Sequence, residues 1–257
     1  MFSLEIECDA DDRDLLIAEL WELGSSGIAE LSPARVRAFF EEQAADRGIL
    51  RRRYPGARWR VEEERDWVEA ARQIWRPMEV GKRFFLVPEW RDDPTPAGRL
   101  RITVNPGMAF GTGVHETTQL CLEALEDLLE PGMRVLDVGT GSGILARAAR
   151  LLGAERVYAC DIDPVAIAIA GEGFVGSADA VAANSADLAL ANISPEAVIR
   201  LAPDLLRVLR PGGKLIASGF ENGEVAQVQA VLPPAAAVRQ KNTWISIIVR
   251  NEAASNS

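Results

Sequence analysis

The chain has 257 residues, of which 48% are hydrophobic, and its mean hydropathy is +0.01. A chain of this size and composition can bury a large core in one or two domains. Its formal net charge of −10 and its pI near 4.8 argue against a general nucleic-acid binder, because contacts to phosphates need clustered Lys and Arg side chains. The same charge is compatible with a basic partner.

Three scattered cysteines, Cys8, Cys121 and Cys160, lie in apolar or amphipathic surroundings, which is typical of reduced thiols in a protein core. No apolar run approaches the ~18 residues that a membrane span needs, and the N-terminus lacks the basic and apolar regions of a signal peptide. His115 is the single histidine, which argues against a multi-histidine metal site. We therefore expect a cytoplasmic protein without a membrane segment or a metal.

Residues 1–62 read as a small α/β domain of the ferredoxin-like type. Alternation of Phe2, Leu4, Ile6 and Cys8 with polar residues predicts a half-buried strand. The pattern then predicts a helix at 15–23, a hairpin of strands at 28–31 and 35–40, a helix at 41–50 and a strand at 59–63. The arginine run at 51–53 is interpreted as a solvated charge run rather than a nucleic-acid contact.

A helix at 63–77 is predicted to link this domain to a second one at 78–250, which is followed by a polar tail at 251–257. Helical spacing and stop signals predict helices at 117–130, 144–152, 164–170, 195–209 and 224–232. Apolar runs predict strands at 84–87, 100–104, 135–138, 156–160, 186–191, 214–218, 238–241 and 244–249. This alternation predicts a mostly parallel α/β sheet, and the last two strands, with no helix between them, predict a terminal antiparallel hairpin.

The most informative stretch of the second domain runs from Arg134 to Gly143, Arg-Val-Leu-Asp-Val-Gly-Thr-Gly-Ser-Gly. A strand that enters a glycine turn and then a helix presents backbone N–H groups to a ligand. The spacing Gly-x-Gly-x-Gly fits a dinucleotide fingerprint poorly, because that pattern is Gly-x-Gly-x-x-Gly. Asp161, about 20 residues after Gly139 at the end of the next strand, suits the hydroxyls of a ribose. Together with Asp137, two residues before the first glycine, these residues resemble the S-adenosylmethionine site of class I methyltransferases. Glycines that merely turn the chain would explain the turn but not the two acids.

A longer motif makes the resemblance more specific. Residues 107–118, Gly-Met-Ala-Phe-Gly-Thr-Gly-Val-His-Glu-Thr-Thr, resemble the signature of the PrmA family of class I methyltransferases, which methylates large-subunit ribosomal protein eleven. Shorter stretches at 66–68, 81–90, 136–145, 161–164, 191–193 and 211–213 follow in the order of that family. The resemblance covers nearly the whole chain. It implies an N-terminal substrate-recognition domain, a linker helix and a catalytic domain that transfers methyl groups to lysine and N-terminal amines.

The resemblance also implies roles for single residues. It places Thr118, Gly139, Asp161 and Asn192 in contact with S-adenosylmethionine, and Phe110 in a loop over the methionine end of the cofactor. Gly141, in the glycine turn, is included in the same cofactor site. Without the resemblance, Thr118 would be read as a hydroxyl at the start of a helix, and His115 is either a base or a structural loop residue.

Asn192 is the candidate catalytic residue. It follows a buried strand beside the expected cofactor, and its side-chain carbonyl could hold an amine N–H and aim the lone pair at the methyl group. A turn residue is the alternative interpretation. Methyl transfer from a sulfonium is an in-line displacement, so the protein's main contributions are alignment and desolvation.

The region between Asp163 and Ala191 is short for the family. The predicted helix at 164–170 is followed by Gly-Glu-Gly, where a longer helix and loop are usual, so that Ser177 or Asp179 would have to contact adenine. Two alternatives to a ribosomal-protein methyltransferase therefore stay open: a class I methyltransferase of another protein or a small molecule, and a cofactor-binding protein without turnover. The expected partner is a ribosomal protein of the large subunit, with no direct nucleic-acid binding and a monomeric state.

Overall fold

The structure, a computed structural model, describes residues 1–9, 12–32, 34–41, 46–61, 75–105 and 115–252. The chain forms two compact units, Met1–Arg76 and Pro77–Ser257, each of which is described by itself. The predicted helix at 63–77 lies almost wholly outside the described residues, as do most of the signature at 107–118 and most of the predicted tail. Among the described residues, no helix is long and apolar enough to cross a membrane.

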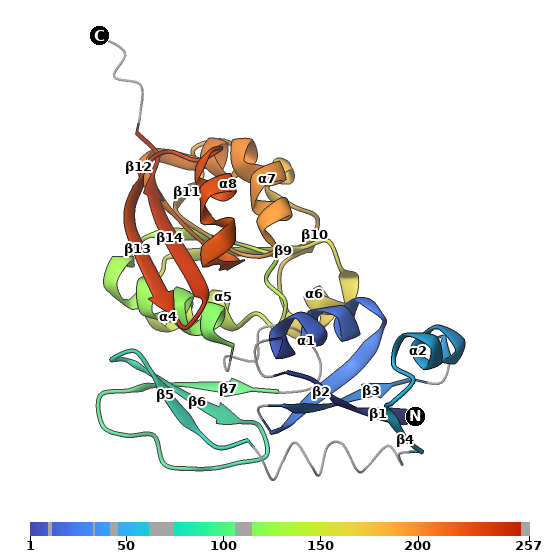
Figure 1. Ribbon diagram of the computed structural model, residues 1–257. Helices are drawn as coiled ribbons and strands as arrows, with labels where there is room; N and C mark the ends of the chain where they lie inside the picture. Colours follow the sequence, from blue (N-terminus) through green and yellow to red (C-terminus); the bar gives the residue numbers. More distant parts are fainter. Residues whose placement is uncertain (10–11, 33, 42–45, 62–74, 106–114, 253–257) are drawn as a thin grey trace. The chain divides into compact units, whose positions relative to one another are not determined.

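The N-terminal unit is a four-stranded antiparallel sheet with two helices (Figure 1). Its elements are β1 (Phe2–Glu7), α1 (Arg13–Glu22), β2 (Ser25–Ser32), β3 (Arg35–Phe40), α2 (Arg47–Arg53) and β4 (Arg58–Val61). The sheet order β2-β3-β1-β4 with this element sequence is the ferredoxin-like arrangement, which confirms the predicted fold of this unit.

One face of this sheet carries the core of the unit. Phe2, Leu4 and Ile6 alternate along β1 and pack in one cluster with Leu20 of α1 and Leu50 of α2. The period of two in the sequence thus places every second side chain of β1 under the helices.

The second helix begins later than predicted. It starts at Arg47 and not at residue 41, because the Asp46 carboxylate caps it by accepting the N–H groups of Gly48 and Ile49 at 2.7 and 3.2 Å. The arginine run, Arg51–Arg53, forms the last turn of α2 and is exposed, so its guanidinium groups lie at the negative end of the helix dipole.

The C-terminal unit contains a seven-stranded sheet of order β10-β9-β8-β11-β12-β14-β13. Its strands are β8 (Arg134–Val138), β9 (Arg156–Asp161), β10 (Phe174–Val175), β11 (Ala186–Asn192), β12 (Leu209–Glu221), β13 (Ala235–Lys241) and β14 (Trp244–Arg250). All neighbouring pairs are parallel except β12–β14 and β13–β14. The predicted mostly parallel sheet with a terminal antiparallel hairpin is confirmed.

Helices cover both faces of this sheet (Figure 1). They are α4 (Glu116–Leu128), α5 (Ile144–Leu151), α6 (Pro164–Ala170), α7 (Pro195–Val208) and α8 (Val225–Gln229), with short 3₁₀ helices η1 (Ala178–Ala180) and η2 (Asn222–Glu224). One cluster of buried side chains joins α7 and α8 to the sheet, and α4 and α5 pack on the opposite face. Covering both faces explains why the central strands read as continuous apolar runs.

A separate three-stranded sheet, β5-β6-β7, precedes α4. Its strands are β5 (Met78–Val80), β6 (Phe84–Pro88) and β7 (Leu100–Val104). The two predicted strands are present and pair in parallel, whereas β5 was not predicted. A strand of three residues is too short to show the alternation by which strands are recognised in a sequence.

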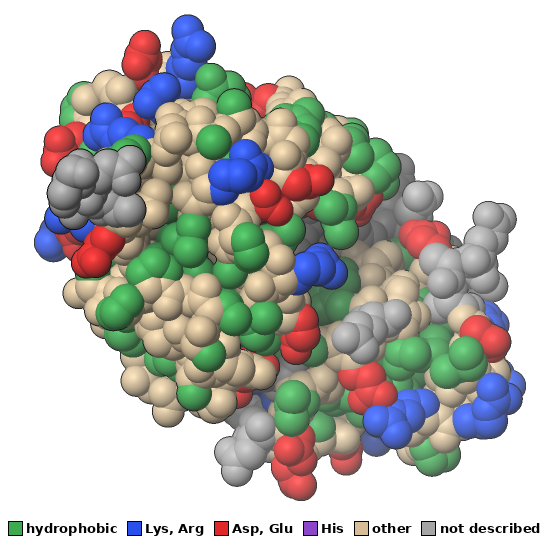
Figure 2. Space-filling model, turned by 90° about the horizontal axis from the view of Figure 1, so that it is seen from above, with side chains coloured by type: hydrophobic (Ala, Val, Ile, Leu, Met, Phe, Trp, Pro, Cys, Tyr) green, Lys and Arg blue, Asp and Glu red, His purple; other side chains and the backbone are tan. Residues whose placement is uncertain are grey.

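Charged side chains of both signs are visible in Figure 2, where those of the described residues are interspersed with hydrophobic ones.

Candidate functional site

The glycine turn after β8 adopts a backbone that requires glycine. Gly139, Gly141 and Gly143 have φ values of 71°, 53° and 76°, in the left-handed region. A Cβ added at Gly139 would lie 2.3 Å from the Cγ2 atom of Ile193, so a side chain is excluded by contact as well as by conformation. The turn is held to the neighbouring strand because the Gly139 N–H donates to the Cys160 carbonyl at 2.9 Å.

Asp137 stabilises the glycine turn through hydrogen bonds. Its buried carboxylate accepts the Thr140 hydroxyl at 2.7 Å and the Ala146 N–H at 3.1 Å, and thus ties the turn to the first residues of α5. Burial raises the pKa of Asp137 to about 6, against the opposing effect of these hydrogen bonds. The acid two residues before the first glycine therefore has a structural role as well as being part of the sequence motif.

Asp161 lies at the carboxyl end of β9, beside the same turn. Its Oδ2 atom accepts the Gly141 N–H at 3.0 Å, and its Oδ1 atom accepts the Asp163 N–H at 3.0 Å. The carboxylate is thereby fixed in orientation while it still lines the cavity described below.

Asn192 ends β11 and meets Thr118 of α4. The Asn192 Nδ2 group donates to the Thr118 hydroxyl at 3.3 Å, and the Thr118 side chain is fully buried. The Asn192 Oδ1 atom is buried and accepts no hydrogen bond within the described part of the chain. A buried acceptor of this kind favours a ligand that donates a hydrogen bond to it.

His115 caps α4 rather than standing alone in a loop. Its Nδ1 atom lies 2.8 Å from the Thr117 hydroxyl, and its ring meets the Trp244 ring edge-on, with centroids 4.6 Å apart. Both rings line the cavity, where the start of β14 meets the start of α4.

These groups surround one cavity of about 760 Å³, a size typical of sites for small molecules and cofactors. It brings together five of the residues predicted from the sequence: Thr118, Gly139, Gly141, Asp161 and Asn192. Phe110, the sixth, lies outside the described residues. Ser177 and Asp179 also line the cavity, from the segment that the sequence marks as short.

Several lining residues were not predicted as site residues. They include Ile144, Ile162, Arg200, Asp204, Gly219 and Trp244. Gly219 has φ 102°, and an added Cβ would lie 2.1 Å from the Ile193 carbonyl oxygen, so that β12 and the end of β11 approach closely at the cavity wall. The available signal was the position of Gly219 shortly after the apolar run at 215–217, because parallel strands end at the same edge of a sheet.

The residues present fit an S-adenosyl cofactor. The left-handed glycine turn leaves room for a ligand close to the backbone, and a carboxylate stands at the end of the adjacent strand for a ribose. The unsatisfied Asn192 Oδ1 adds a buried acceptor. Within the described residues, no group of three or more His, Cys, Asp or Glu side chains is placed to hold a metal ion.

Known proteins resemble this chain over most of its length. The sequence model of the ribosomal protein L11 methyltransferase (PrmA) family matches residues 42–252. The ribosomal protein L11 methyltransferase of Symbiobacterium thermophilum is 44% identical over 207 residues, which cover 75% of this chain and 68% of that protein. The corresponding protein of Pelobacter propionicus is 34% identical over 311 residues, with coverages of 97% and 98%. The crystal structure of a ribosomal protein L11 methylase from Lactobacillus delbrueckii subsp. bulgaricus matches with a TM-score of 0.63 and 30% identity, over 69% of this chain and 99% of that one.

The comparison with the Pelobacter protein runs over 311 residues, whereas this chain has 257, so that relative carries segments without a counterpart here. The family match nevertheless begins within the first unit, at residue 42, covers nearly all of the second, and includes the residues that line the described cavity. On these grounds the chain belongs to the ribosomal protein L11 methyltransferase (PrmA) family.

Proposed function

We propose that this methyltransferase uses S-adenosylmethionine to methylate lysine and N-terminal amines of ribosomal protein L11. Family membership supports the reaction class and the substrate. The observation that carries the site is the buried Oδ1 atom of Asn192, which accepts no hydrogen bond from the described residues, in a cavity also lined by the glycine turn and Asp161. We further propose that the protein is a monomer and that it acts in the cytoplasm, where ribosomal proteins are made.

The glycines, Asp161 and Asn192, which would hold the cofactor, lie at the ends of three neighbouring strands, and α4 and η1 add further contacts. The carboxylate of Asp161 would accept hydrogen bonds from the ribose, since each of its oxygens has a lone pair beyond the one used by Gly141 or Asp163. Gly139 and Gly141 let the ligand approach the turn, Thr118 lies beside Asn192, and Phe110 would cover the methionine end. Asp179 or Ser177 would contact adenine.

Bound S-adenosylmethionine would supply an electrophilic methyl group, so the protein's task is to present a neutral, oriented amine. Deprotonating a lysine at neutral pH requires on the order of 4 kcal/mol, which desolvation in the cavity would reduce. The Asn192 Oδ1 atom accepts an N–H of the amine, and the Thr118 hydroxyl holds the amide in this orientation through Nδ2. Through these contacts the amine lone pair would be aimed at the reacting carbon.

Residues 1–62 are proposed to recognise the protein substrate, with the helix at 63–77 as the linker. They form a unit with its own core, and the catalytic residues all belong to the other unit. A second unit is not needed by an enzyme that acts on a small molecule.

Calorimetric titration with S-adenosylhomocysteine tests the cofactor site. We expect micromolar binding to the intact chain and a loss of at least about tenfold in Asp161→Ala, because a charged hydrogen bond to the ribose is removed. Labelled S-adenosylmethionine with unmethylated ribosomal protein L11 then tests the reaction. Cofactor binding without methyl transfer to any protein would favour a cofactor-binding protein without turnover. Methyl transfer to a small molecule alone would favour a small-molecule methyltransferase.

A further inference from the structure

The connection from β10 to β11 is short and contains no α-helix. Parallel strands are normally joined by a helix that covers the sheet, but here residues 176–185 contain only η1 (Ala178–Ala180). Ala178 is fully buried in the cluster that α7 forms with the sheet, and Val181 packs against that cluster. These two side chains are small, so their packing alone fixes the segment weakly, although the segment forms one wall of the cavity.

Arg207, in the last turn of α7, supplies the missing attachment. Its Nη1 group donates to the Val181 carbonyl at 2.8 Å, and its Nη2 group donates to the carbonyls of Ala178 and Asp179 at 2.9 and 3.2 Å. Its Nε group donates to the Asp204 carboxylate at 3.0 Å, which fixes the plane of the guanidinium. One side chain thus satisfies three carbonyls of η1 and the residue that follows it.

The backbone reinforces this contact. The Asn184 N–H donates to the Arg207 carbonyl at 3.0 Å, and the Ser185 N–H donates to the Val208 carbonyl at 2.9 Å. The end of α7 therefore binds the segment in its middle, at 178–181, and at its C-terminal end, at 184–185. A lysine could not replace the guanidinium, because its ammonium is a point charge without the planar fork of donors.

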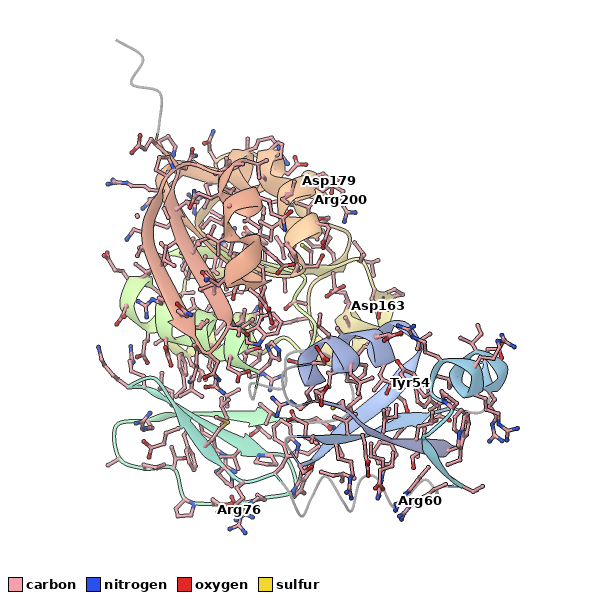
Figure 3. The ribbon with its side chains drawn as sticks, in the orientation of Figure 1. Tyr54, Arg60, Arg76, Asp163, Asp179 and Arg200 are labelled. Carbon is pink, nitrogen blue, oxygen red and sulfur yellow. The ribbon has the colours of Figure 1, made fainter. Side chains whose placement is uncertain are left out.

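The segment held in this way presents Asp179 to the cavity. Asp179 and Arg200, on η1 and α7, both line it, and Figure 3 shows the two side chains close together on neighbouring elements. Arg207 does not line the cavity, so that it acts there through its neighbours: the backbone of η1, and the Asp204 carboxylate, which lines the cavity.

We propose that Arg207 is a positioning residue of the cofactor site: it replaces the absent helix and fixes η1 so that the Asp179 carboxylate accepts the 6-amino group of the cofactor's adenine. This inference rests on the proposed function and deepens it. It makes purine recognition depend in part on a guanidinium that lies outside the cavity.

The test compares two ligands in calorimetric titrations of the full chain: S-adenosylhomocysteine and its analogue with purine in place of adenine, which lacks the 6-amino group. The wild-type chain is expected to prefer the adenine ligand by about tenfold, the worth of one hydrogen bond to a charged acceptor. Arg207→Gln is expected to lose this preference, mainly through weaker binding of the adenine ligand. Asp179→Ala should do the same, and the double variant should lose no more than either single variant.

The matched control is Arg150→Gln. Arg150 also lies in the last turn of a helix, is 38% exposed against 37% for Arg207, and pairs with a carboxylate, that of Glu172, and with a carbonyl, that of Val157. This variant should keep the preference. Circular dichroism checks the folding of each variant. If Arg207→Gln does not fold, Arg207→Lys, which keeps the charge, takes its place. Arg207→Lys is also expected to lose the preference for the adenine ligand.

An equal loss for both ligands in the Arg207 variants would make Arg207 a purely structural residue and overturn the proposal. A retained preference, or a wild-type chain that does not distinguish the ligands, would overturn it too. A wild-type chain that binds with the expected preference but methylates no protein would contradict the proposed function and leave this inference standing.

Discussion

At the scale of single residues, the site depends on groups whose hydrogen-bonding capacity is only partly used inside the protein. The Asn192 amide donates to Thr118 and leaves its buried Oδ1 atom without a partner among the described residues. A buried acceptor without a donor costs free energy. A substrate amine that donates an N–H to the Asn192 Oδ1 atom removes this cost, which favours binding of the amine in that orientation.

The corresponding prediction concerns Asn192→Ala. We expect kcat for protein methylation to fall by about a hundredfold, because the amine loses the acceptor that orients it, while the Kd for S-adenosylhomocysteine should rise by a smaller factor, of less than about tenfold, because Asn192 also lies beside the cofactor. Steady-state kinetics and calorimetry measure the two quantities. Thr118→Val, which removes only the hydroxyl that orients the amide, should show a smaller fall, of about tenfold. Unchanged kcat in Asn192→Ala would remove this residue from the mechanism.

A second prediction concerns pH and Asp137. Burial raises its pKa to about 6, above the value of about 3.9 in an unfolded chain, so the folded state binds its proton more tightly. The stability linked to this proton is present at low pH and is lost as the pH rises through about 6. Between pH 5.5 and 7.5 the loss should be about 1 kcal/mol in the free energy of unfolding.

Urea unfolding of the wild-type chain and of Asp137→Asn at these two pH values isolates this effect. The variant has no titrating group at this position, so its stability relative to the wild type should rise by that same amount at the higher pH. The comparison cancels the carboxylates elsewhere, and it also cancels any fixed loss from the weaker hydrogen bonds of the amide. A relative stability that does not change with pH would show that Asp137 titrates as an exposed acid.

At the scale of elements, close approaches of backbone shape the cavity. Gly219 on β12 lies against Ile193, where the register between β12 and β14 also shifts between Ser218 and Phe220. Gly219→Ala should lower the free energy of unfolding by at least about 3 kcal/mol, because its Cβ would lie 2.1 Å from the Ile193 carbonyl oxygen. Urea unfolding followed by circular dichroism measures this loss.

Gly98 provides the matched control. Its φ of 80° is also left-handed, but an added Cβ would meet nothing within 4 Å. Gly98→Ala should therefore show only the conformational cost of about 1 to 2 kcal/mol. Equal losses in the two variants would mean that the close approach at Gly219 relaxes freely and does not shape the cavity wall.

Most elements could be predicted from the sequence because their signals are local. Asp161 and Asn192 could be assigned to one site because both end parallel strands, and such ends meet at one edge of a sheet. The missed elements lack such signals: β5 and β10 are too short for any periodicity, and the start of α2 depends on the cap at Asp46. The contacts of Arg207 could not be predicted, since its partners are carbonyl groups that every residue carries.

At the scale of the whole molecule, the separation into two units gives a test of substrate recognition. Removing residues 1–76 should leave S-adenosylhomocysteine binding within about threefold, because all residues of the described cavity belong to the second unit, whereas methylation of ribosomal protein L11 should fall by at least about a hundredfold. The shortened chain is first checked for folding by circular dichroism. Full methylation by this chain would point to a substrate recognised by the catalytic unit alone.

The position of β14 has a consequence for synthesis of the protein on the ribosome. β14 lies between β12 and β13 in the sheet, although it follows both in the chain. β13 therefore has no place in the sheet until residues 244–250 have left the exit tunnel. Until then the edge of β12 stays open, which makes the nascent chain a candidate for chaperone binding during translation.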